Sequence, residues 1–313
     1  MACPFEVLLN AGQYPEGTEL ALDVLDLIDR FEDQLSFFRP ESELSRVNRE
    51  AADGPMEIDA GLFEILSRSA ALNRETGGAF DITSTPLWEA WGFARRSGRV
   101  PSETEIAEAL ADVDAQAVRL DAEDRTVSFD RPGLRLNLGS IAKGYALDRC
   151  AEEMERRGIF DFLVHAGGSS VIARGDSRQP RPENISAAGW PVGVPHPTRP
   201  GRRLAEIWLY DAALATSGSR QQSFVHEGRR LSHILDPRTG HPAEGLLSVT
   251  VVADEAIDAD AVATALFVMG PDEATQYAEE RGELGVLMAL PSRQAGGCET
   301  RTINLAEDRL RWL

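Results

Sequence analysis

The most regular hydrophobic pattern in the chain runs from Ile257 to Gly270, where almost every residue is apolar. The apolar positions fall on and around one face of a 3.6-residue helical repeat, and they are Ile257, Val262, Ala261, Ala265, Leu266, Val268 and Met269. Gly270 and Pro271 then form a stop signal. The pattern predicts a buried helix over residues 257–270.

An acidic residue, Asp260, lies inside this apolar helix, and Thr264 follows four residues later on the same face. A buried carboxylate is costly unless it is paired or bound to a metal. Two oxygen ligands one turn apart suit Mg2+, which adds water and phosphate oxygens to a few protein ligands. On spacing alone the simpler interpretation is structural: Asp260 faces the helix dipole, and the Thr264 hydroxyl bonds back to its own helix.

The rest of the chain mixes helical and strand patterns. Helices are predicted at 20–35, at 62–72, from a Ser102/Glu105 capping box to Leu110, from about 141 and from about 272. Strands are predicted at 7–9, 117–121, 126–129, 134–138, 162–164, 170–172, 190–194, 204–209, 213–216, 246–253 and, as the last core strand, 284–290. Without regular alternation, these elements favour an α+β fold in one domain over residues 1–313. Pro, Arg and Gly between 174 and 203 indicate a surface loop.

Composition narrows the class of protein. A chain of 313 residues with 42% hydrophobic and 27% charged residues is typical of a soluble globular enzyme. Its formal net charge of -19 argues against a general nucleic-acid or anionic-membrane surface, so a polyanionic ligand needs a local site. Cys3, Cys150 and Cys298 show no metal or redox spacing, and we expect these thiols to be bystanders.

The N-terminal residues enter a strand-like Val7-Leu8-Leu9 with no charged segment, apolar segment or membrane span before it. As written, the sequence predicts a cytoplasmic protein without a transmembrane segment. An export signal is expected only if a longer precursor exists.

Three loop regions carry candidate chemistry. Residues 136–146 run from a strand through Gly139 into a helix, a geometry that directs backbone N–H groups and Lys143 at an anion, although an ordinary turn is equally compatible. Residues 215–220 and 232–240 add hydroxyls, His233 and arginines that fit phosphate oxygens. Each is also good turn chemistry, and a lone histidine is more often structural than catalytic.

Taken together, these stretches resemble the FAD:protein FMN transferase family, also described as thiamine-biosynthesis lipoproteins. The resemblance covers nearly the whole chain, in the family's order: Ser42–Asn48, Thr76–Asp81 with Trp91–Phe93, Gly139–Ala146, Ala166–Gly168, Ala215–Gly218, Ser232–Gly240 and Asp258–Thr264. It implies a flavin-transferase-like α+β fold with a mixed or antiparallel sheet core and packed helices.

The resemblance also implies an activity. Members bind FAD and Mg2+, cleave the pyrophosphate, transfer FMN through a phosphoester to a Thr or Ser hydroxyl of an acceptor protein, and release AMP. Carried over by position, the metal ligands are Ser140, Asp260 and Thr264. The FAD contacts are Met1, Phe38, Ala79, Phe80, Asp81, Asn137, Lys143 and Ile234. His233 is the candidate base for the acceptor hydroxyl.

Three departures from the family pattern leave other activities open. Asn137 replaces an aspartate, Ser169 replaces another, and residues 219–222 replace Asp-Tyr-Arg-Asn. The alternatives to transfer are a Mg2+-dependent FAD pyrophosphatase, in which water replaces the acceptor hydroxyl, and an FAD-binding protein without catalysis.

Overall fold

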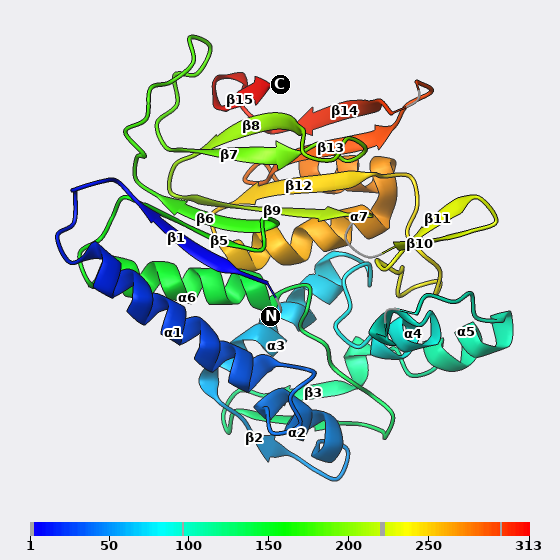
Figure 1. Cartoon of the computed structure of the whole chain (residues 1–313). Helices are drawn as coiled ribbons and strands as arrows, with labels where there is room; N and C mark the ends of the chain where they lie inside the picture. Colours follow the sequence, from blue (N-terminus) through cyan, green and yellow to red (C-terminus); the bar gives the residue numbers. More distant parts are fainter. Residues whose placement is uncertain (1–2, 96, 220–222, 295) are drawn as a thin grey trace. The chain divides into compact units, whose positions relative to one another are not determined.

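The computed structural model describes residues 3–95, 97–219, 223–294 and 296–313 (Figure 1). The chain divides into two compact units. The first unit contains residues 30–142 and 219–244, and the second contains residues 2–29, 143–218 and 245–313. The single domain expected from the sequence over residues 1–313 stays a prediction.

A seven-stranded antiparallel sheet forms the centre of the second unit. Its strands, in spatial order, are β1 (Phe5–Leu9), β5 (Phe162–Ala166), β6 (Ser170–Arg174), β9 (Ala212–Gly218), β12 (Ser248–Ala253), β13 (Gly285–Pro291) and β14 (Cys298–Ile303). The central strands are buried along most of their length, which agrees with their nearly continuous apolar sequences. The predicted α+β class with an antiparallel sheet core is confirmed.

A smaller antiparallel sheet packs on this unit's large sheet. It has the order β15-β8-β7, with β7 at Trp190–Pro195, β8 at Arg203–Leu209 and β15 at Leu310–Trp312. Leu163 and Val171 of the large sheet share one apolar core with Trp190 and Ile207 of the small one. Figure 1 shows the two sheets as neighbouring layers.

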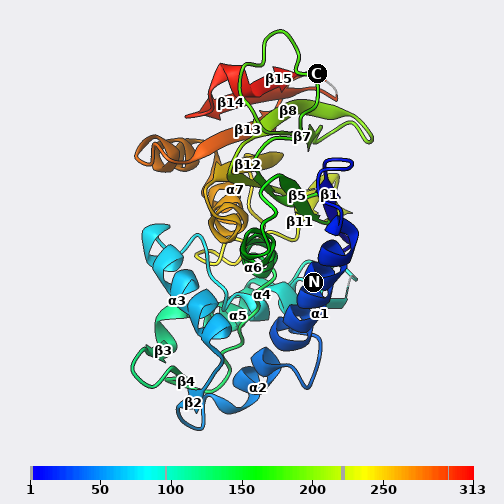
Figure 2. The ribbon, with the colours of Figure 1, turned by 90° about the vertical axis from the view of Figure 1, so that its left-hand side faces the viewer.

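Two helices of the second unit, α6 (Ala142–Arg156) and α7 (Ala256–Glu279), lie beside each other (Figures 1 and 2). α7 packs on β9 and β12 of the large sheet. It is bent at Gly270, whose φ of 77° and ψ of 179° are non-helical, and Pro271 follows. The predicted helix over 257–270 and the second one from about 272 are therefore both confirmed, as two parts of one bent element.

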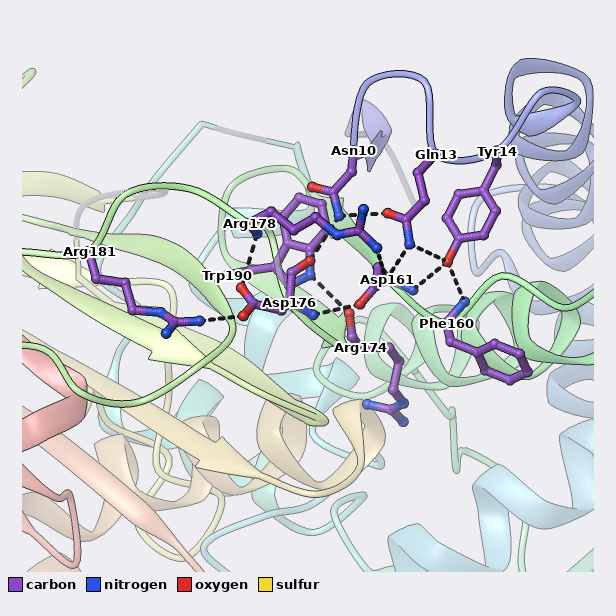
Figure 3. A network of polar contacts seen from close by, with 10 residues as sticks. All are labelled: Asn10, Gln13, Tyr14, Phe160, Asp161, Arg174, Asp176, Arg178, Arg181 and Trp190. Atoms are coloured by element: carbon purple, nitrogen blue, oxygen red, sulfur yellow. Dashed lines mark hydrogen bonds and ion pairs between the residues drawn. The ribbon is translucent and has the colours of Figure 1, made fainter.

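A polar network holds the start of the predicted surface loop in the second unit (Figure 3). The Tyr14 hydroxyl accepts hydrogen bonds from the backbone N–H groups of Phe160 (3.1 Å) and Asp161 (3.0 Å). The Asp161 carboxylate accepts the N–H of Asp176 at 2.8 Å, and Asn10 donates to the Asp176 carbonyl at 2.8 Å. Residues far apart in sequence thus fix the chain after β6.

The first unit is built from short elements. They are α2 (Glu43–Glu50), α3 (Ala60–Glu75), α4 (Thr85–Ala90), α5 (Glu103–Leu110), the sheet of β2 (Met56–Glu57), β4 (Thr126–Phe129) and β3 (Val118–Asp121), and the hairpin of β10 (Ser223–His226) and β11 (Arg229–Ser232). The Ser102/Glu105 capping box at α5 is present as predicted. An apolar cluster around Trp91 and Phe93 is closed by a hydrogen bond from the Trp91 indole to the Gly240 carbonyl (2.8 Å). α1 (Gly17–Leu35) has residues in both units.

One predicted element is wrong. Residues 134–138 do not form a strand, because the Asn48 side chain takes the backbone groups of Leu136, accepting from its N–H at 2.7 Å and donating to its carbonyl at 2.9 Å. The strand predicted at 284–290 is present as β13, and β14, which the sequence did not predict, pairs with it. Among the described residues, no helix is long and apolar enough to cross a membrane.

Candidate active site

Among the described residues, Asp260 is the most deeply buried charged residue on the helices of the second unit. Only 6% of its surface is exposed. Removing a carboxylate from water is offset only by direct partners. Asp260 has three: the Lys143 ammonium at 2.6 and 2.8 Å from its two oxygens, the Ser170 hydroxyl at 2.9 Å, and the backbone N–H of Gly144 at 3.3 Å. The acid inside the apolar helix is therefore paired.

Lys143 and Gly144 reach Asp260 because both lie in the first turn of α6. The first N–H groups of a helix have no partner within the helix and carry the positive end of its dipole. In the structure Lys143 and the Gly144 N–H contact the carboxylate of Asp260, and a ligand anion at this turn stays a prediction. A ligand anion bound at this turn would therefore lie beside the Lys143–Asp260 ion pair.

Gly144 is required by the approach of α6 to α7. A Cβ at this position would lie 2.1 Å from the carbonyl oxygen of Ala256 and 2.6 Å from the Cα of Ile257. Both atoms belong to the main chain, so they cannot rotate away as a flexible side chain could. The glycine of the Gly139–Ala146 motif thus lets the two helices come into contact.

Thr264 lies one turn after Asp260 on α7. Its hydroxyl is 3.0 Å from the Ser217 hydroxyl and donates to the Asp260 carbonyl at 3.3 Å. The bond back to its own helix is the structural role that spacing allowed, and the contact with Ser217 adds a second hydroxyl oxygen.

The oxygen atoms around Asp260 in the second unit are of the types that bind hard cations. Asp260 supplies an anionic oxygen, and Thr264 and Ser217 supply neutral ones, which is the ligand chemistry of Mg2+. Within the described ranges no group of three His, Cys, Asp or Glu side chains is placed to hold a metal. A cation here would therefore depend on hydroxyl, water and phosphate oxygens and would share Asp260 with Lys143.

In the first unit, Asp81 is the centre of a tight turn. Its carboxylate accepts from the backbone N–H (2.7 Å) and hydroxyl (2.6 Å) of Thr83, and from the Asn73 amide at 3.2 Å. Burial raises the pKa of Asp81, and the bonds from Thr83 act against that rise. Ala79 and Phe80, just before it, are each 1% exposed and belong to the core.

Asn137 and Ser140 lie in the turn that leads to α6. The Asn137 side-chain oxygen accepts from the Gly139 N–H at 2.9 Å, and the backbone N–H of Asn137 donates to the Ile82 carbonyl at 2.8 Å. An aspartate could accept the same bond, so the Asn137 replacement preserves the turn while removing a charge. Ser140 is half-buried and belongs to the first unit, whereas the other two predicted metal ligands belong to the second.

The remaining predicted residues of the first unit differ in exposure. The Phe38 ring is 68% exposed and meets Trp88 edge-on with centroids 6.3 Å apart, so it can offer a face to a planar ligand. Ile234 is buried, and the His233 ring lies 6.3 Å from that of Phe93. Met1 lies outside the described residues.

The arginine expected to bind phosphate, Arg238, makes a local ion pair. Its guanidinium contacts Asp236 at 3.0 and 3.1 Å, and the N–H of Gly240 closes the turn on the Asp236 carbonyl at 2.8 Å. The turn chemistry of Asp236–Gly240 is therefore present as predicted.

Sequence reasoning missed Ser170 as a partner of Asp260. It included Ser217 among the hydroxyls of residues 215–220 but did not pair it with Thr264. Ser170 follows the Gly167-Gly168 pair that the sequence did single out. The signal was therefore present in sequence, but strand pairing decides which hydroxyl faces α7.

Comparison with known proteins gives one consistent result. Residues 1–288 match the sequence model of the ApbE family. The FAD:protein FMN transferase of Haemophilus influenzae is 34% identical over 255 residues, covering 79% of this chain and 71% of that protein. That of Escherichia coli strain K12 is 32% identical over 272 residues, covering 85% and 75%.

Solved structures show the same likeness. The flavin transferase ApbE from Vibrio cholerae has a TM-score of 0.81 at 29% identity, covering 96% of this chain and 94% of that one. The ApbE protein from Thermotoga maritima has a TM-score of 0.80 at 31% identity, covering 95% and 96%. The fold is thus shared along almost the full length of the described chain.

Proposed function

Because the chain belongs to the ApbE family, we propose that it is a Mg2+-dependent FAD:protein FMN transferase. In this proposal it cleaves FAD and attaches FMN through a phosphoester to a Thr or Ser hydroxyl of an acceptor protein. AMP is released. The names of its relatives support the transferase activity, while the metal and the acceptor hydroxyl are our inference.

The observation that carries the proposal is the buried Asp260–Lys143 pair with Thr264 one turn away. A structural ion pair does not need a hydroxyl pair beside it, whereas a site for a diphosphate and a cation needs both charges and neutral oxygens. The pair also lies at the start of α6, where the positive end of the helix dipole favours negative charge.

In the second unit we assign the metal to Asp260 and Thr264, and Ser140 of the first unit stays the third ligand that the family resemblance implies. Mg2+ bound there would neutralise charge on the pyrophosphate oxygens. Lys143, whose side chain is 20% exposed, can extend its ammonium toward a phosphate while staying near Asp260.

In the reaction, the acceptor hydroxyl oxygen forms a bond to the phosphorus on the FMN side. The bond from that phosphorus to the bridging oxygen breaks, and AMP leaves with the bridging oxygen. We assign His233 as the base that takes the hydroxyl proton. FAD would be held by Phe38, Ala79, Phe80, Asp81, Asn137, Lys143 and Ile234, together with Met1.

Replacing Lys143 by Met should lower FAD affinity at least about tenfold, because it removes a charge-assisted contact that is worth about 1.5–3 kcal/mol. Flavin fluorescence against protein concentration measures this affinity. Lys143→Arg is the matched variant and should retain part of the binding, since it keeps the charge. Equal affinities of Lys143→Met and wild type would remove Lys143 from the site.

One incubation tests the proposed reaction. The protein with FAD, Mg2+ and a serine- or threonine-bearing acceptor fragment should release AMP and add an FMN phosphoester to the fragment. AMP without any change in the mass of several acceptors would make the protein a pyrophosphatase. FAD that stays intact and bound would make it a flavin-binding protein without catalysis.

A further inference from the structure

Asp148, a buried acid of α6 that the reaction does not use directly, binds the beginning of α7. It is 7% exposed. One carboxylate oxygen accepts the N–H of Ala256 at 2.7 Å, and the other accepts the N–H of Ile257 at 2.8 Å. These are the first two residues of α7, so both hydrogen bonds satisfy donors that the helix itself leaves free.

Asp148 supplies the capping hydrogen bonds that the N-cap residue of α7 does not make. Glu255 occupies the N-cap position of α7 but makes no capping hydrogen bond with its side chain. Asp148 therefore caps α7 from the neighbouring helix, and its negative charge lies at the positive end of that helix dipole.

The contact is reciprocal. Asp148 of α6 accepts from the first turn of α7, while Asp260 of α7 accepts from Gly144 in the first turn of α6. On each helix the acid lies one turn after the donor. The two exchanges flank the close approach of Gly144 to Ala256, and Figure 2 shows the helices beside each other.

We propose that Asp148 is a positioning residue for the Lys143–Asp260 pair, because it fixes the register of α7 against α6. The role for catalysis rests on the proposed transferase function. A slip of α7 by one residue would move Asp260 by about 1.5 Å along the helix axis. Such a shift would break the contacts of Asp148 with α7 and of Asp260 with α6 at the same time. The two carboxylates therefore fix the same register between the two helices.

Because Asp148 can ionise, its contribution to the free energy of unfolding depends on pH, which that of an uncharged capping residue would not. Burial raises its pKa from 3.8 to about 6; Glu255 acts in the same direction, while the two N–H groups and Arg149 act against it. Between about pH 4 and pH 6 the folded state keeps a proton that the unfolded state has released. The contribution of Asp148 to the free energy of unfolding therefore falls as pH rises through this window and is constant above it.

The first test is a double-variant cycle on the rate of AMP release at pH 7.5. Asp148→Asn should lower kcat at least about tenfold in the wild-type protein, but less than about twofold when Asp260 is already Asn, because the residue to be positioned is then gone. Glu152→Gln, an exposed acid one turn further along α6, is the control and should leave kcat unchanged. Equal fold losses in both backgrounds would overturn the positioning role.

The second test reads the same cycle from denaturant midpoints and does not depend on activity. The double variant should unfold at the midpoint of the less stable single variant. Loss of either carboxylate already removes the contacts that fix the register of α7 against α6. Additive shifts would overturn the inference. The difference between wild type and Asp148→Asn should also change with pH only between about 4 and 6. If wild-type protein neither transfers FMN nor releases AMP, the proposed function fails, and this second cycle decides the coupling alone.

Discussion

Asp260→Asn should reduce the rate of FMN transfer at least about a hundredfold, on the order of 3 kcal/mol of transition-state stabilisation. The amide keeps the shape and one acceptor oxygen, but it removes the negative charge that faces Lys143 at 2.6 and 2.8 Å. It also removes the anionic ligand from the proposed metal set. The fold should survive, because Lys143 is 20% exposed and its ammonium can turn to water.

Titration of the rate with Mg2+ separates this role from a structural one. Asp260→Asn should need much more Mg2+ for half-maximal rate. Asp258→Asn removes a less buried acid in the first turn of the same helix and should titrate like wild type. Matching midpoints and rates for Asp260→Asn and wild type would return Asp260 to the role of a buried ion-pair partner.

Gly144→Ala should destabilise the protein by about 2 kcal/mol or more, although alanine is the better helix former by about 1 kcal/mol. The added Cβ would lie 2.1 Å from the Ala256 carbonyl oxygen, so the two helices must move apart. This movement also lengthens the 3.3 Å bond from the Gly144 N–H to Asp260. The clash therefore outweighs the gain in helix propensity.

Denaturant unfolding measures the effect, with Gly282→Ala as the matched control. A Cβ at Gly282 would have no neighbour within 4 Å, and its φ is not in the left-handed region. The control should unfold within a few tenths of a kcal/mol of wild type. If Gly144→Ala unfolds at the wild-type denaturant concentration, the helices do not approach as closely as described.

Elements with local signals could be predicted from the sequence. The helix over 257–270 has apolar periodicity and a Gly-Pro stop, and α5 has its capping box. The wrong strand at 134–138 fails for a non-local reason, since Asn48, 88 positions before Leu136, takes the backbone groups that a ladder would use. β14 is likewise defined by its partner β13, because its own sequence alternates weakly.

The candidate site shows the same limit. Asp260 and Lys143 could each be singled out, one as an acid in an apolar helix and one beside a glycine turn. Their pairing could not, because 117 positions separate them and only the fold of the second unit brings α6 to α7. Asp148 gave no signal at all, since an acid on a helix is usually solvated.

The intact mass of an acceptor fragment after incubation with the protein, FAD and Mg2+ tests the central claim most directly. The proposal predicts a gain equal to one FMN phosphoester on a Thr or Ser, one AMP released for each fragment modified, and formation of both products at least about a hundredfold slower with Asp260→Asn. An acceptor modified at the same rate by wild type and Asp260→Asn would contradict the assignment of the reaction to the Asp260–Lys143 pair.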